Sequence, residues 1–144
     1  MAHDRNDEFW KPRNLRPHLK DIKPAVMTVG GWFDAENLFG ALETYRSVEV
    51  QSPRTSNILV MGPWVHGGWS RGPGDRLGNV NFRAKTSEFY REQIELPFLT
   101  RFLKGATNSS LPEAYVFETG TDQWRRHDAW PPKNARERTL YETL

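Results

Sequence analysis

The sequence has 144 residues, enough for one domain or for one domain and part of another. Twenty Lys and Arg side chains against eighteen Asp and Glu side chains leave a net charge of +2, too small and too dispersed to indicate a nucleic-acid partner. No stretch approaches the roughly 20 apolar residues of a membrane span, and the absence of cysteine excludes disulfides and thiolate metal sites while leaving the compartment undetermined.

The mean hydropathy of −0.75 is low for a chain whose length predicts burial of roughly 68–70% of its unfolded surface. Two explanations fit this value. Either the sequence forms a very polar domain, or part of the core that it helps to build belongs to residues outside the sequence.

The first predicted strand follows an irregular N-terminal segment. Residues 1–21 are expected to be irregular or weakly helical, because Pro12 and Pro17 interrupt any long helix. The opening "MAHDRNDEFW" lacks the apolar run of a signal peptide. The next stretch, "KPAVMTVGG" at Lys23–Gly31, is apolar and β-branched without alternation, which predicts a strand covered on both faces.

A helix and a second strand come next. The helix is predicted at about Asp34–Arg46, where apolar positions recur on one face. These positions are Leu38, Ala41, Leu42 and Tyr45. The run "NILVMG" at Asn57–Gly62 then predicts a second buried strand.

The second half begins with a long loop. From Pro63 to Asn81 the chain is rich in Gly, Trp and Pro, which is typical of an irregular connection. A long helix is predicted for Thr86–Lys104, with a kink at Pro97. Residues Gly105–Pro112 indicate a linker, and the segment after it has the composition of β-strands.

The order strand–helix–strand–loop–helix is typical of a parallel α/β unit. Two parallel strands alone do not form a stable sheet, since both faces and both edges need cover. We therefore predict an α/β fold in which this sequence supplies the C-terminal part of a larger domain, followed by the beginning of a β domain.

Two residues follow the predicted strands where doubly wound sheets carry reactive groups. Asp34 follows the first strand in "VGGWFDAENLFGA", and His66 follows the second in "VMGPWVHGG". An aspartate that orients an imidazole, and an imidazole that accepts a hydroxyl proton, are two members of a nucleophilic triad. The pattern alone leaves two alternatives open: Asp34 as a helix N-cap and His66 as an ordinary loop histidine.

These two stretches resemble the CocE/NonD family of serine hydrolases, in particular the α-amino-acid ester hydrolases and glutaryl-cephalosporin acylases, with X-Pro dipeptidyl-peptidases more distant. "EFYREQIELPFLTRFLKG" resembles the family's last helix, and "AYVFETGTDQWRRHDAWPP" the start of its jelly roll. The resemblance implies that residues 1–105 are the C-terminal portion of an α/β-hydrolase catalytic domain and that residues 112–144 begin a C-terminal β jelly-roll domain. It places the triad acid at Asp34 and the general base at His66.

The resemblance also implies a serine hydrolase or acylase whose nucleophile lies outside this sequence. Expected substrates are small esters, amides or short peptides, among them α-amino-acid esters, β-lactam side-chain amides and X-Pro peptides. No metal or organic cofactor is expected, and the histidines never fall at the i, i+4 spacing of a helical zinc site. Expected partners are the missing N-terminal part of the catalytic domain or a second copy of the chain.

The alternative hypothesis belongs to another class. The chain would be a non-catalytic truncated or complementation module, which folds fully only beside a chain that carries the missing strands.

One serine lies in a motif that could be mistaken for a nucleophile elbow. "GWSRG" at Gly68–Gly72 is a formal match to Gly-x-Ser-x-Gly, but an elbow needs a strand directly before the serine and a helix directly after it. Ser70 follows a predicted loop and precedes "RGPG". The order of an α/β-hydrolase triad, with serine before acid and histidine, is also violated. We therefore predict that Ser70 is not the nucleophile.

Three further residues are candidates for substrate binding. Asp7 and Glu8 fall near the place where the amino-acid ester hydrolases carry carboxylates for the substrate ammonium. The alternative is that both are solvent-facing acids of a terminal segment. Trp69, near His66, is expected either to line the site or to pack between domains. The same two roles are open to Trp32 and Trp64, with packing favoured, and Trp124 and Trp130 are expected in the core of the β domain.

Overall fold

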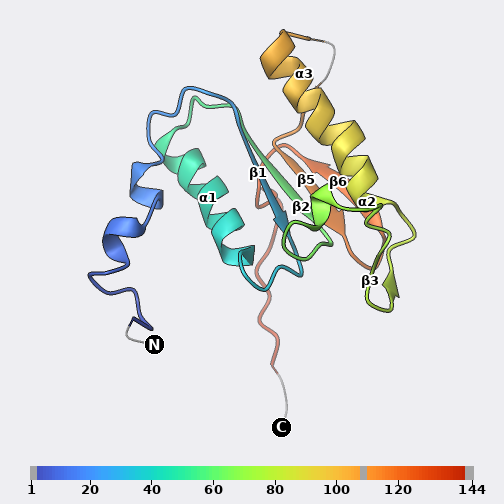
Figure 1. The fold of residues 1–144 in the computed structure, drawn as a ribbon, viewed down its shortest axis with the longest axis horizontal. Helices are drawn as coiled ribbons and strands as arrows, with labels where there is room; N and C mark the ends of the chain where they lie inside the picture. Colours follow the sequence, from blue (N-terminus) through green and yellow to red (C-terminus); the bar gives the residue numbers. More distant parts are fainter. Residues whose placement is uncertain (1–2, 108–109, 142–144) are drawn as a thin grey trace.

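The computed structural model describes residues 3–107 and 110–141 and is built around a four-stranded sheet in the order β1-β2-β5-β6 (Figure 1). Strands β1 (Val26–Gly31), β2 (Asn57–Gly62) and β5 (Ala114–Glu118) run parallel, and β6 (Gln123–His127) is antiparallel to β5. The structure is therefore α/β with a mixed sheet, and its parallel part matches the predicted class.

Strand β2 forms the centre of the core because both of its faces are covered. Leu59 and Met61 pack toward α1 (Leu38–Gln51) on one face of the sheet. Ile58 and Val60 point to the other face, where they meet a second cluster that includes Tyr90, Ile94 and Phe98. A strand buried on both faces gives a continuous apolar run, and the predicted second strand is confirmed in bounds and burial.

Strand β1 is only partly buried, less than its apolar run predicts. It is the first strand in the sheet order, and only its last two residues, Gly30 and Gly31, are buried. Its parallel register with β2 runs as far as Gly31 opposite Gly62. The two strands therefore end at the same rim of the sheet.

The N-terminal segment forms two short 3₁₀ helices, η1 (Lys11–Arg13) and η2 (Arg16–His18), each with a proline in its first turn. The prolines limit the helices in the predicted way. The segment is attached to α1 through Arg16: its carbonyl accepts a hydrogen bond from the Gln51 side chain at 2.8 Å, and its guanidinium donates to Glu43 at 3.2 Å.

Helix α1 begins at Leu38, whereas the apolar periodicity predicts a start at about Asp34. The reason is that Oδ1 of Asp34 accepts hydrogen bonds from the amides of Glu36 and Asn37, both at 2.9 Å. Such side-chain bonds favour a turn over a helix. The predicted apolar stripe nevertheless faces the sheet, because its four members belong to the cluster on the β2 face.

The long loop after β2 contains more regular structure than predicted. It includes a 3₁₀ turn, η3 (Gly68–Ser70), and a small antiparallel hairpin of β3 (Arg76–Leu77) and β4 (Val80–Asn81).

The helix after the loop is continuous but not uniform. It consists of α2 (Thr86–Phe89), the π-helical turn η4 (Tyr90–Glu95) and α3 (Leu96–Lys104). The first amide after the π turn donates to the carbonyl of Arg91, five residues back. Pro97 has no amide hydrogen to donate, and the irregularity expected there takes the form of this wider turn. Within the described residues, no helix is long and apolar enough to cross a bilayer.

The segment after residue 112, predicted to begin a jelly roll, starts inside the same sheet. Strand β5 pairs with β2 in parallel, from Leu59 opposite Ala114 to Met61 opposite Val116. Trp124 of β6 packs against the cluster that contains Tyr90 and Ile94. The first strands after the linker thus extend the α/β sheet. The jelly roll itself stays a prediction.

Candidate active site

Backbone hydrogen bonds join the chain just beyond β1 and β2. The amide of Trp32 donates to the Gly62 carbonyl at 2.9 Å, and the amide of Phe33 donates to the Trp64 carbonyl at 3.1 Å. A Cβ atom on Gly31 would lie 2.1 Å from the Trp64 oxygen, so a side chain at this position would prevent the approach. The glycine that closes the first apolar run therefore lets the two turns come together.

Asp34 and His66 meet at this rim. Nδ1 of His66 lies 2.9 Å from Oδ2 of Asp34. The aspartate side chain is only 2% exposed, whereas the histidine side chain is 50% exposed. The structure thus places a buried carboxylate against an imidazole that is still accessible to a reacting group, which is the arrangement of an acid and base in a catalytic triad.

The hydrogen bonds of Asp34 indicate that it is ionised. Burial raises the pKa of Asp34, but the amide hydrogen bonds from Asn37 and Glu36, together with His66, outweigh this effect and hold the pKa below its ordinary value of 3.8. An ionised carboxylate only accepts hydrogen bonds, so Nδ1 of His66 carries the proton. In a neutral ring this leaves a lone pair on Nε2.

The alternative in which Asp34 is the helix N-cap is wrong, because the N-cap of α1 is Asn37. One oxygen of Asp34 instead holds the turn before α1, while the other meets His66. The turn bonds fix the carboxylate in position for the second contact.

The loop after His66 brings an aromatic ring to the pair. Gly67 has a left-handed backbone with φ of 69°, which suits glycine, and the chain then enters η3. The ring of Trp69 lies 6.2 Å from that of His66 in a T-shaped arrangement and 6.1 Å from that of Trp64. Trp69 is therefore beside the candidate base and also packs on the buried Trp64, so the geometry is compatible with both of its expected roles.

The first turn of the helix that follows the loop holds the loop in place. Oγ of Ser87 donates to the Gly68 carbonyl at 3.1 Å, and Oγ1 of Thr86 donates to the Gly74 carbonyl at 2.6 Å. Both side chains are fully buried. Sequence reasoning missed these residues, because Thr and Ser at the start of a helix are common and nothing local shows that they reach back to the loop.

Ser70 does not lie in the setting of a nucleophile elbow. It ends the 3₁₀ turn η3, after a loop and before extended chain. Its hydroxyl donates to the carbonyl of Gly67 at 2.9 Å, so it acts as part of the loop's own hydrogen bonding. That the nucleophile lies elsewhere stays a prediction.

Asp7 and Glu8 belong to the N-terminal segment, which runs along the side of α1 that faces away from the sheet (Figure 1). Oδ2 of Asp7 is 2.7 Å from Nδ1 of His3, and its Oδ1 accepts from the Phe9 amide at 2.9 Å. The His3 hydrogen bond is the main cause that lowers the pKa of Asp7. Glu8 pairs with Lys11. The structure does not bring either carboxylate to the acid–base pair, and their ammonium-binding role stays a prediction.

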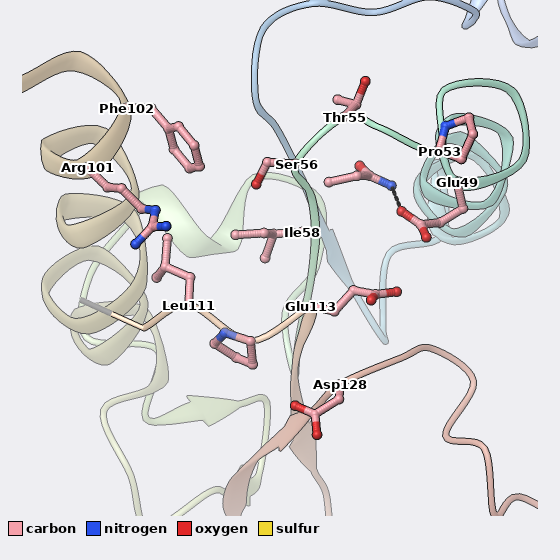
Figure 2. Close-up of a pocket in the computed structure, with 12 residues that line it drawn as sticks. Glu49, Pro53, Thr55, Ser56, Ile58, Arg101, Phe102, Leu111, Glu113 and Asp128 are labelled. Atoms are coloured by element: carbon pink, nitrogen blue, oxygen red, sulfur yellow. Dashed lines mark hydrogen bonds between the residues drawn. The ribbon is translucent and has the colours of Figure 1, made fainter. Parts of the chain in front are cut away.

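A cavity of about 420 Å³ lies at the opposite ends of the strands (Figure 2). Glu49 of α1, Ser56 before β2, Glu113 before β5, and Arg101 and Phe102 of α3 line it. In open α/β sheets ligands bind beyond the carboxyl ends of the strands, so this cavity is not part of the candidate site.

In the part of the chain that the structure describes, no three His, Asp or Glu side chains are grouped to hold a metal ion.

Comparison with known proteins gives relatives along nearly the whole chain. Residues 1–68, which include both members of the pair, match the X-Pro dipeptidyl-peptidase family (S15 family). Over 133 residues the chain is 27% identical to cocaine esterase from Rhodococcus sp. (strain MB1 Bresler). The structure matches those of an aminopeptidase from the marine sediment archaeon Thaumarchaeota archaeon and of a selenomethionine-labelled α-amino acid ester hydrolase, each with a TM-score of 0.82 and 32% identity.

The chain is thus similar to the X-Pro dipeptidyl-peptidase family (S15 family) over residues 1–68. The resemblance inferred from the sequence motifs is thereby confirmed, and the α/β fold is shared with solved structures. The matches cover 91% of the chain for cocaine esterase and the aminopeptidase and 90% for the ester hydrolase, but only 22% of each of those proteins. The chain thus spans about a fifth of the length of these relatives.

Asp34 is expected to make the unfolding of this protein sensitive to acid. Because its folded-state pKa lies below 3.8, its stabilising contribution is complete above that ordinary value and is lost as the pH falls through the lower folded-state pKa. We expect Asp34→Asn to lack this dependence. The difference in unfolding free energy between the two proteins, measured by urea unfolding from about pH 7 to about pH 3, should be largest near neutrality and shrink below about pH 4. A constant difference would show that the carboxylate is not stabilised as described.

Proposed function

We propose that this segment supplies the acid and the general base of a serine hydrolase site that cleaves esters or amides through an acyl-enzyme. The observation that carries the proposal is the 2.9 Å contact between the buried Asp34 carboxylate and Nδ1 of the half-exposed His66. Its place just beyond the carboxyl ends of β1 and β2 is where α/β folds bind ligands. The names of the relatives, an esterase, an ester hydrolase and an aminopeptidase, support hydrolysis of acyl compounds.

In the proposed reaction Nε2 of His66 removes the proton from an attacking hydroxyl. The hydroxyl oxygen forms a bond to the substrate carbonyl carbon, and the bond from that carbon to the leaving group breaks as His66 returns the proton to the leaving group. Water, deprotonated by the same imidazole, then attacks the acyl carbon. The bond from that carbon to the enzyme oxygen breaks, His66 returns the proton to that oxygen, and the acid is released. Asp34 keeps the proton on Nδ1 throughout and stabilises the imidazolium that forms in each step.

The attacking hydroxyl is proposed to come from outside this sequence. Ser70 is bonded to its own loop and lies on no strand–helix turn, and the chain corresponds to 22% of its relatives. We refer below to the complete hydrolase, meaning a protein in which residues 1–144 are joined to the rest of such a domain. The isolated chain would then be catalytically inert, which agrees with the alternative hypothesis of a module that needs the missing part to act.

The substrate is proposed to be a small ester, an amide or a short peptide, with α-amino-acid esters, β-lactam side-chain amides and X-Pro peptides as the classes to test first. The ring of Trp69 meets that of His66 edge to face, so it would form an apolar wall on one side of the base. Such a wall limits water near the reacting atoms. No cofactor takes part in the proposed steps.

The experiment that tests this function is an assay of ester and amide hydrolysis by the complete hydrolase, its Ser70→Ala variant and the isolated chain. We expect the complete hydrolase and Ser70→Ala to share the same kcat within about twofold, because the Ser70 hydroxyl takes no part in the chemistry. The isolated chain should give only the uncatalysed rate. Turnover by the isolated chain, or its loss in Ser70→Ala, would contradict the proposal.

A further inference from the structure

The loop that follows His66 is held in place by side chains of the helix that comes after it in the chain. Three carbonyl groups within Gly68–Gly72 accept hydrogen bonds from the helix that begins at residue 86. Ser87 serves the carbonyl of Gly68. The remaining two, those of Trp69 and Gly72, are both served by Arg91.

The guanidinium of Arg91 spans the loop like a fork. Its Nη1 donates to the Trp69 carbonyl at 3.0 Å, and its Nη2 donates to the Gly72 carbonyl at 2.9 Å. Both bonds have ordinary N–H···O lengths and a cationic donor. A planar guanidinium holds two carbonyls at a fixed separation, which the point charge of a lysine does not do.

The position of Arg91 in the helix is unusual. It lies in the π turn η4, where its own carbonyl is bonded to the amide five residues ahead instead of four. A π turn changes the direction in which nearby side chains leave the helix, and such turns are frequent at functional sites.

The tethered residue is also the one that contacts the candidate base. The backbone of Trp69 is bonded by Arg91, and the ring of Trp69 packs edge to face against that of His66. An ordered His66 ring is needed for Nε2 to stay aimed at a hydroxyl while Nδ1 stays on Asp34.

We propose that Arg91 is a positioning residue for His66, acting through the backbone and ring of Trp69. Its two guanidinium hydrogen bonds go to the loop backbone and not to Asp34 or His66. Its role rests on the proposed function, because a positioned base matters only where His66 acts as one.

The first test compares kinetics of the complete hydrolase with those of Arg91→Ala and Arg91→Lys. We expect Arg91→Ala to lower kcat about 10-fold or more while KM changes by less than about threefold, since misplacement of a base affects the chemical step more than binding. Arg91→Lys, which keeps the charge but not the fork, should fall between the two. The matched control is Arg126→Ala, which removes a guanidinium–carbonyl bond to Ser110 of 2.8 Å away from the loop and should leave kcat unchanged.

The second test is independent of turnover and uses the 144-residue chain. The amides of Gly68, Ser70 and Arg71 are hydrogen bonded within the loop. In Arg91→Ala we expect their hydrogen exchange to accelerate about 10-fold or more and the low-field Nδ1 proton signal of His66 to broaden. Arg126→Ala should change neither.

The two tests separate the failure of this inference from that of the proposed function. Unchanged loop exchange in Arg91→Ala, or a loss of kcat no greater than in Arg126→Ala, overturns the role of Arg91. Full activity of a His66→Ala enzyme overturns the proposed function instead, whatever the exchange data show.

Discussion

His66→Ala in the complete hydrolase is expected to reduce kcat for ester hydrolysis by roughly 10⁶, the scale of loss for a histidine in a serine-hydrolase triad. The reason is that one imidazole performs two proton transfers in each half of the reaction. It takes the proton from the attacking hydroxyl and gives it to the leaving group. Alanine offers no group that can do either. KM should change little, since the ring is not required to hold the substrate.

The control for this variant is His127→Ala. His127 ends β6, where its ring packs against that of Trp130 with centroids 5.4 Å apart, and it has no contact with the candidate pair in the structure described. It should retain kcat within about twofold. Circular dichroism should show both variants folded, because His66 is half exposed and its removal leaves no cavity. Substantial turnover in a folded His66→Ala enzyme would end the assignment of the base.

Asp34→Asn is expected to lower kcat by about 10⁴, less than the histidine variant. The asparagine oxygen can still accept hydrogen bonds from the amides of Glu36 and Asn37, so the turn before α1 is preserved. Its amide nitrogen, however, is a donor at the place where the carboxylate accepts. It therefore favours the tautomer with the proton on Nε2, and the lone pair that must receive the hydroxyl proton is lost.

Asp34→Ala provides the matched comparison. It removes the hydrogen bonds from the amides of Glu36 and Asn37 as well as the contact with His66, so it should lose thermal stability in addition to activity. The Asn variant should remain close to wild type in stability at low pH while being nearly inactive. Equal activity of the Asn variant and wild type would contradict the tautomer argument.

The sequence predicted the parts of the fold that depend on local pattern. Both strands that carry the pair, the amphipathic stripe of α1 and the positions of Asp34 and His66 after their strands are visible as apolar runs, periodicity and spacing. That the two side chains would share a rim followed from the parallel connection alone. The contact itself depends on Gly31 and its close approach to the Trp64 carbonyl. The apolar sequence that ends in this glycine does not predict that approach.

Features that depend on distant partners were not predictable in the same way. The composition of β5 indicates a strand, but nothing in it shows that β2 is its neighbour. The two donors of Arg91 reach carbonyl groups some twenty residues earlier. Every residue has a backbone carbonyl, so the sequence does not show which of them accepts a hydrogen bond. The late start of α1 has a local cause, the Asp34 side chain, which competes with the helix that periodicity favours.

Covalent labelling tests the central claim most directly. The complete hydrolase and its His66→Ala variant would be treated with a fluorophosphonate, and the modified serine located by peptide mapping. We expect a single labelled serine outside residues 1–144, with labelling slowed by several orders of magnitude in His66→Ala, because the imidazole activates that hydroxyl. A label on Ser70, or an equal labelling rate in the two proteins, would contradict the claim that Asp34 and His66 serve a hydroxyl supplied from elsewhere.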